Sequence, residues 1–409
     1  MPEVIVIGAG VVGISTALAI QRRGYHVTVL DRAGVAAEAS AGNAGALAFA
    51  DIEPLATPGI LRQAPKWLLD PLGPLSVSPG YAPRLAPWLW RFWRASRPAR
   101  HRAGTAAQAV LMGLSRAAFE RQVADVGGQG FLRPEGQLQL YEGARQFRAS
   151  LPGWELRRTH GVVFRLLESP EEIAALQPGI HPRFTHAGFT PGWINFTDPK
   201  LWVEHLALRF TERGGRIERA KVASITPAAR IMVEAGAPYA ADHVVLAGGA
   251  WSRGLAASLG DSVPLETERG YNTTLPAGAF DLRMQLTFGG HGFVVTRIGD
   301  GLRVGGAVEL AGLKYPPNYA RADALLKKAK AFLPRLNTEG GARWMGFRPS
   351  MPDSLPVIGP ARADARVIHA FGHGHLGLTQ AAGTAEIVAD LVSGRAPTID
   401  LSPYRATRF

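Results

Sequence analysis

Three glycines near the start of the chain have the spacing of a dinucleotide-binding loop. Gly8, Gly10 and Gly13 follow the β-branched run 4–7 and precede a helical pattern, and Asp31 lies 18 residues after the last of them. The first glycine permits a tight turn, the second lets backbone touch a pyrophosphate, and the third lets helix pack on strand. Asp31 is placed to accept from a ribose hydroxyl and disfavours a 2′-phosphate, so the unit predicts FAD or NAD rather than NADP.

Two further segments favour FAD over NAD. The small polar loop 39–45 can wrap a pyrophosphate and a ribityl chain, with Ser40 and Asn43 supplying hydrogen bonds; the alternative is a plain surface turn. Near the end of the chain a strand pattern leads into the glycine-rich run 372–377 and then into a helical pattern. The N-terminus of that helix can stabilise negative charge on a reduced flavin, and a simple NAD domain does not need this third piece.

In these motifs the chain resembles the D-amino acid oxidase-like superfamily of flavoproteins, and most closely the bacterial D-amino acid dehydrogenases. The motifs lie along nearly the whole chain in the family's order. They are GAGVVG at 8–13 with Asp31-Arg32, SAGNAG at 40–45, Gly270-Tyr271, RVGGAVE at 303–309, GFRP at 346–349, DSLPVIG at 353–359 and GHGHLG at 372–377.

The resemblance implies FAD as the cofactor and a set of residues that bind it. These are Gly8, Gly10, Val11, Val12, Gly13, Asp31, Arg32, Ser40, Asn43, Ala44, Gly45, Val222, Gly248, Gly374, His375, Leu376, Gly377, Leu378 and Thr379. No metal is expected, because His373 and His375 form an H-x-H pair without a third ligand nearby.

Four residues are candidates for contact with a substrate. Arg348 matches the arginine with which the superfamily holds a substrate carboxylate, and Tyr271 matches a tyrosine that bonds the same group. His373 could stabilise an anionic reduced flavin when protonated, and His291 lies on a loop that could reach the pocket. The alternatives are a salt-bridged structural arginine, a core tyrosine and histidines that only fill turns.

The resemblance implies oxidation of a D-amino acid to its imino acid by hydride transfer from Cα to flavin N5, with electrons passed to a quinone or another respiratory acceptor. Segment 265–271 is more charged than in D-alanine-oxidising members, which favours a polar or cyclic substrate such as 4-hydroxy-D-proline. Three alternatives stay open: an oxygen-using D-amino acid or amine oxidase, the flavin subunit of a multi-subunit imino-acid dehydrogenase, and a non-catalytic FAD-binding module.

The elements that position these residues predict an α/β protein of two domains. A Rossmann-like FAD-binding domain is expected from 1–55, 198–264 and 346–409, and a substrate-binding domain (α+β) from 56–197 and 265–345. Alternating apolar residues at 292–297 are typical of an antiparallel sheet with one face on the flavin. The length of 409 residues is sufficient for two such domains.

The composition and the distribution of charge indicate which partners and which cellular location to expect. The net charge is +12, there is no cysteine, and eight arginines but a single acid lie between Arg84 and Arg121, together with three tryptophans. Such a segment is either a helix with buried tryptophans and solvated arginines, or a surface for an anionic membrane or a partner subunit. No nucleic-acid motif accompanies the charge. Because the apolar start at 4–20 lacks a basic leader, a cytoplasmic protein is expected, with a peripheral position on the inner face of the cell membrane as an option.

Overall fold

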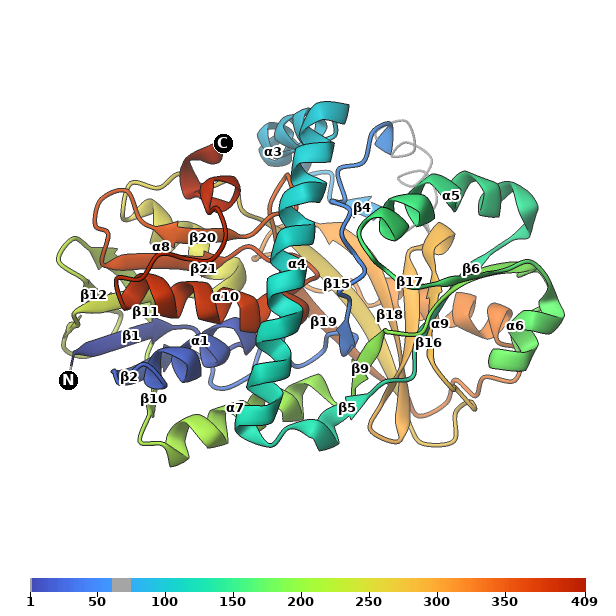
Figure 1. Ribbon diagram of the computed structural model, residues 1–409, viewed down its shortest axis with the longest axis horizontal. Coiled ribbons are helices and arrows are strands. Elements are labelled where there is room, and N and C mark those ends of the chain that lie inside the picture. Colours follow the sequence, from blue (N-terminus) through green and yellow to red (C-terminus); the bar gives the residue numbers. More distant parts are fainter. Residues whose placement is uncertain (1, 61–74) are drawn as a thin grey trace.

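The computed structural model describes residues 2–60 and 75–409 and arranges them in two halves, each built on its own β-sheet (Figure 1). The first sheet has the order β10-β2-β1-β14-β21-β20, and its neighbours are parallel except β20 and β21. Its strands are β1 (Glu3–Ile7), β2 (His26–Asp31), β10 (Arg216–Arg219), β14 (His243–Leu246), β20 (Val357–Pro360) and β21 (Val367–Phe371). Parallel strands need long connections, and two of those connections build the second half.

Side chains on β1 alternate between two hydrophobic layers, as on a central strand that is buried on both faces. Val4 and Val6 join the layer formed with the helices α1, α7 and α10, whereas Ile5 and Ile7 join the layer formed with a small sheet and helix α8. These elements are α1 (Val11–Gln21), α7 (Pro199–Glu212), α8 (Ser252–Ala257), α10 (Gly377–Val392), β11 (Val222–Thr226), β12 (Arg230–Val233) and β13 (Tyr239–Ala240).

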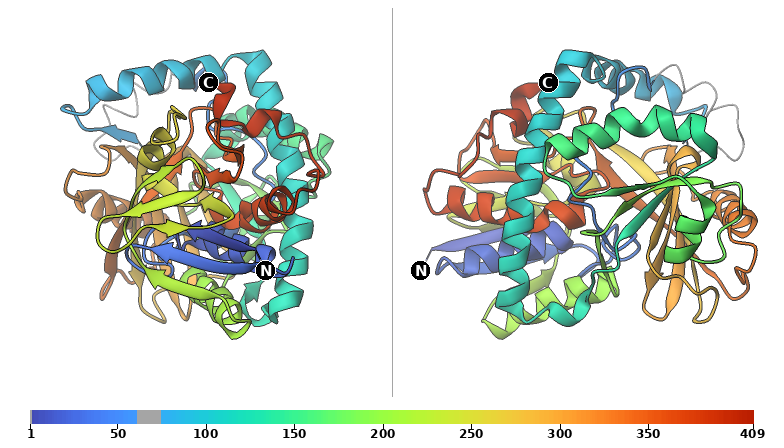
Figure 2. Two further views of the ribbon diagram at one scale, coloured as in Figure 1. Left: turned by 90° about the vertical axis from the view of Figure 1, so that its left-hand side faces the viewer. Right: turned by 45° about the vertical axis from the view of Figure 1, so that its right-hand side comes forward.

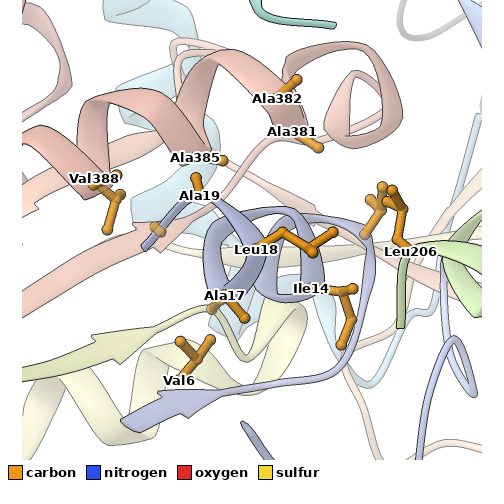
Figure 3. Packing of buried hydrophobic residues seen from close by; sticks show 14 of the residues in the cluster. Val6, Ile14, Ala17, Leu18, Ala19, Leu206, Ala381, Ala382, Ala385 and Val388 are labelled. Atoms are coloured by element: carbon orange, nitrogen blue, oxygen red, sulfur yellow. The ribbon is translucent and has the colours of Figure 1, made fainter. Parts of the chain in front are cut away.

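Helices α1 and α10 pack closely because small side chains line their contact. Figure 3 shows Ala385 of α10 lying toward Ala19 of α1. Ala17, which is also on α1, lies toward Val6 of β1. All four side chains are buried. The first residues of both helices, Val11 and Gly377, border one cavity, so this packing brings two helix N-termini to the same site.

The second sheet runs β19-β15-β18-β17-β16-β6-β8-β7, with β4 paired to β18. It is antiparallel apart from the pairs β16–β6 and β18–β4, so the expectation of a purely antiparallel sheet is corrected to a mixed one. Its strands are β4 (Leu75–Val77), β6 (Gln137–Tyr141), β7 (Arg165–Leu167), β8 (His186–Thr190), β15 (Glu266–Leu275), β16 (Gln285–Phe288), β17 (Phe293–Ile298), β18 (Gly301–Leu310) and β19 (Ala342–Ser350). The helices α5 (Gly143–Thr159), α6 (Pro170–Leu176) and α9 (Ala320–Phe332) flank it.

The two halves share more structure than the expected boundaries allow. Helix α4 (Pro98–Val126) packs against α10, and its Leu111 and Phe119 belong to the core of the FAD-binding half, although 56–197 was assigned to the other domain. Strand β19 crosses the expected boundary at 346 and pairs with β15 up to Ser350. A short sheet of β3 (Ala46–Leu47), β9 (Ile194–Phe196) and β5 (Leu132–Arg133) lies beside α4.

The predicted fold class is confirmed: a parallel, Rossmann-like sheet stands beside a second, mostly antiparallel sheet. Within the described residues, no helix combines the length and the apolar character that a membrane span requires.

Candidate active site

A cavity with a volume of about 830 Å³ is lined by residues of both sheets. Among the segments that line it are the glycine loop at 8–12, the loop at 38–46, the end of β19, and residues 370–378. Its size is within the usual range of ligand-binding pockets. The structure therefore brings most of the predicted cofactor residues together with Arg348.

The glycine loop has the close contacts that a dinucleotide site needs. Gly8 has a φ of +113°, and a Cβ added to Gly13 would lie 1.8 Å from the Gly8 carbonyl oxygen. Only glycine at both positions lets α1 begin directly beside β1. Ser40 Oγ accepts a hydrogen bond of 3.0 Å from the Val11 amide, so its own hydroxyl hydrogen can be donated to a phosphate at this helix end.

Asp31 and Arg32 lie at the end of β2 and border the cavity. The Asp31 carboxylate accepts backbone N–H bonds from Ala9, Ala33 and Gly34 at 2.7–2.9 Å, which fixes the turn and leaves acceptor sites for ribose hydroxyls. The Arg32 guanidinium lies 3.9 Å over the ring of Trp251. Val222 and Gly248 border the same end of the cavity.

The loop 40–45 is held from both sides. The Asn43 side chain donates to the Ser40 carbonyl (3.1 Å) and accepts from the Gly45 amide (2.7 Å), so it shapes the loop instead of pointing at a cofactor. From the second sheet, Asn272 donates to the Gly42 carbonyl (2.7 Å) and Arg303 donates to the Asn43 carbonyl. Sequence reasoning missed both donors, because their position depends on which face of the strand they occupy.

The start of α10 offers the cavity backbone N–H groups more than side chains. Gly374, His375, Gly377 and Leu378 border the cavity, and the free N–H groups of a first helical turn suit the pyrimidine carbonyls of a flavin. Leu376 is buried, and so is Thr379, whose hydroxyl accepts from the Ala48 amide at 3.0 Å. These two predicted residues therefore contribute through the helix they begin and not through their side chains.

The two histidines of the glycine-rich turn differ. His373 is buried, its Nε2 lies 2.9 Å from Thr384 Oγ1, and burial lowers its pKa to about 3. It is neutral at physiological pH, so the prediction of a protonated His373 beside a reduced flavin is corrected. His375 has an exposed side chain that borders the cavity. The surrounding walls partly desolvate its ring and so lower its pKa; Glu268 opposes this lowering, and Arg348 adds to it.

A β-bulge positions Arg348. The pairing of β15 with β18 shifts by one residue between Arg269 and Tyr271, and Ala307 on the bulged strand has a left-handed φ of 53°. The Ala307 carbonyl accepts a hydrogen bond of 3.1 Å from Arg348 Nη1. A Cβ on Gly270 would lie 2.3 Å from Arg348 Nη2, so glycine is required beneath the guanidinium. Bulges commonly redirect groups beside active sites in this way.

Arg348 has no carboxylate partner in the part of the chain that the structure describes. No acid in the described ranges lies within ion-pair distance of its guanidinium, which borders the cavity. Burial lowers the pKa of Arg348, and Glu268 on the neighbouring strand partly opposes this. Arg348 is partly buried, and a partly desolvated cation without a bound anion is unfavourable, so the site favours a ligand that brings a carboxylate.

Two predicted substrate residues are not brought to the site. Although Tyr271 borders the cavity, its hydroxyl donates to Glu309 and accepts from the Asn318 amide (3.0 Å), on the face of β15 opposite Gly270. His291 Nε2 lies 3.1 Å from Glu142 Oε1, and His291 is not among the cavity-lining residues. The phenol bond expected from Tyr271 and the contact expected from His291 are therefore corrected.

Fold and site together are those of a flavin-dependent oxidoreductase. The chain belongs to the family described as "FAD dependent oxidoreductase" (DAO), which matches residues 3–391. It is 36% identical to a D-amino-acid oxidase of Bradyrhizobium diazoefficiens, with all of both chains covered. It is 33% identical to a D-amino acid dehydrogenase of Neisseria meningitidis serogroup A over 99% of this chain and all of that one. Its fold is similar to that of glycine oxidase from Geobacillus kaustophilus (TM-score 0.79, 20% identity, all of both chains covered).

The contact between Gly13 and Gly8 gives a test of cofactor binding. We expect Gly13→Ala to purify with little or no FAD, because the added Cβ forces α1 away from β1. The readout is the ratio of flavin to protein absorbance after purification and after reconstitution. Gly113→Ala is the matched control, since a Cβ there meets no atom within 4 Å. Full flavin content in Gly13→Ala would contradict the assignment.

The buried His373 predicts a pH dependence of stability. The unfolded chain takes up a proton at this histidine below its ordinary pKa of 6.5, whereas the folded chain does so only near pH 3. Stability is therefore lost as the pH falls from 6.5 toward 3, by about 2 kcal/mol between pH 7 and pH 5. His373→Gln should lose correspondingly less stability over that interval in thermal unfolding of the holoenzyme. The exposed His26→Gln serves as the control, and an unchanged pH response in His373→Gln would count against the argument.

Proposed function

We propose that the protein oxidises the α-carbon of a D-amino acid to the imino acid. The observation that carries the proposal is Arg348, a guanidinium that borders the cavity beside the flavin site and has no carboxylate partner among the described residues. FAD, when bound, supplies the chemistry of accepting two electrons and the Cα hydrogen. The names of the relatives, D-amino-acid oxidase and D-amino acid dehydrogenase, support the D-stereochemistry.

In this proposal the chain's own residues bind and orient the substrate. Arg348 pairs with the α-carboxylate in a bidentate manner, and the Ala307 carbonyl fixes the plane of its guanidinium. His375, whose lowered pKa keeps the imidazole neutral, faces the same cavity and accepts a hydrogen bond from the substrate amino group. A neutral amine is the form that gives up its Cα hydrogen readily.

The preference for a polar substrate has a different basis from the one expected. In the charged segment 265–271, Arg269 is buried and donates to the carbonyls of Gly312, Tyr315 and Pro316, so it does not reach a substrate. Polar side chains instead enter the cavity from β6 and β16. They are Gln137, Gln139, Gln285 and Thr287. This amide-rich wall supports a polar or cyclic D-amino acid, such as 4-hydroxy-D-proline, over D-alanine.

For the electron acceptor we propose a quinone or another respiratory carrier, as for a dehydrogenase. The second candidate is an oxidase that uses oxygen directly, which the name of the Bradyrhizobium relative favours. Both candidates use the same cavity and the same Arg348, so they differ only in how fast the reduced flavin reacts with oxygen.

The proposal is tested by following the visible spectrum of the holoenzyme without oxygen. We expect the flavin bands to bleach with a D-amino acid, most rapidly with cis-4-hydroxy-D-proline, and not with L-isomers. Admitting air then separates the acceptors: slow recovery indicates a dehydrogenase and rapid recovery an oxidase. A flavin that no D-amino acid reduces would overturn the proposed function.

Arg348 itself can be tested against a neighbour on the same strand. We expect Arg348→Ala to lower kcat/KM by about 100-fold, mainly through KM, because a charge-assisted contact to the carboxylate is lost. Arg343→Ala is the control, since Arg343 is half exposed and paired with Asp323. Flavin content reports on folding. If both variants had the same kcat/KM, Arg348 would not be the carboxylate-binding residue.

A further inference from the structure

Helix α3 (Ala82–Ala95) presents an apolar stripe to solvent. Its three tryptophans differ in exposure. Trp88 is buried, whereas Trp90 and Trp93 have exposed fractions of 52% and 42%. The other exposed apolar residues of this helix are Ala82, Pro83, Ala86, Pro87 and Leu89. Residues at this helical spacing share one face, so α3 is apolar on the side turned away from the protein.

The opposite side of α3 anchors it to the second sheet. Leu85 and Trp88 form a small buried cluster with Leu310 of β18, and Phe92 stacks on Trp88 with ring centroids 5.2 Å apart. The helix therefore has an inner apolar face that is satisfied and an outer one that is not. Figure 2 shows α3 at the upper edge of the molecule in both views.

The charged residues on and directly after α3 are all positive. Residues 82–102 contain six arginines and no acid: Arg84, Arg91, Arg94, Arg97, Arg100 and Arg102. Across the described residues none of the six lies within ion-pair distance of a carboxylate. Instead, the guanidinium groups of Arg94 and Arg97 lie 4.6 Å over the exposed rings of Trp90 and Trp93.

We propose that α3 docks the holoenzyme on an anionic lipid surface. Tryptophan rings at headgroup depth with arginines on lipid phosphates are the arrangement of an interfacial amphipathic helix. Arginine side chains can lie along apolar surface while their charged ends reach phosphate. Phe92 and Trp88 remain in their present contacts, so docking needs no rearrangement of the fold.

Charge distinguishes this occupant from a second copy of the chain. A two-fold symmetric contact through α3 would place the six arginines of one copy against the six of the other. Such like-charge contact without counter-ions is unfavourable, whereas a surface of phosphates supplies the missing anions. The inference does not depend on the proposed reaction.

Flotation of the holoenzyme with lipid vesicles tests the proposal. We expect binding to vesicles of phosphatidylcholine mixed with phosphatidylglycerol, little binding to phosphatidylcholine alone, and release by salt. The double variant Trp90→Ser with Trp93→Ser, and the triple variant of Arg94, Arg97 and Arg100 to Gln, should each bind at least about tenfold more weakly.

The matched control is Leu201→Ser with Leu208→Ser on α7, where two leucines are each 52% exposed, and it should bind like the unmodified protein. Flavin content and thermal unfolding show that all variants are folded. Equal binding to neutral vesicles, absence of flotation, or loss of a dimer in the tryptophan variant without any lipid effect would each overturn the proposal.

Discussion

The loop at residues 40–45 connects the two halves of the protein through hydrogen bonds, and the arrangement of the cavity depends on it. Its Ser40 hydroxyl accepts from the first turn of α1, and its carbonyls accept from Asn272 and Arg303 of the second sheet. One short segment is thus hydrogen-bonded to both halves. The cavity lies between these halves and is lined in part by this loop. Because the partners of the loop are buried or half-buried, its hydrogen bonds are protected from exchange with water.

The substrate side of the cavity stores free energy that a ligand can release. Ala307 adopts a backbone conformation that non-glycine residues rarely use, and the partly buried Arg348 has no carboxylate within ion-pair distance among the described residues. The strain at Ala307 comes from the bulge, whereas the cost of the unpaired guanidinium is one that an anionic ligand would offset. Binding selectivity follows, because a ligand without an anionic group leaves the guanidinium unpaired.

Motifs formed by neighbouring residues could be predicted from the sequence. Contacts that depend on which face of a strand a side chain occupies could not. The glycine loop, Asp31 and the start of α10 border one cavity, and each could be recognised because it depends on residues adjacent in sequence. Tyr271 and its neighbour Asn272 show the limit: one residue of strand register decides which of the two side chains meets the flavin loop. The parallel pairing of β6 with β16 joins residues about 150 apart, and no local pattern encodes such a partner.

The strand order of the first sheet has a consequence for folding during synthesis of the chain. Strand β1 leaves the ribosome first, yet β14 beside it and β21 beyond that are synthesised only after long intervening segments. Until then the apolar edge of β1 and the face of α1 that receives α10 lack their partners. The nucleotide-binding half can therefore be completed only after α10 has been translated.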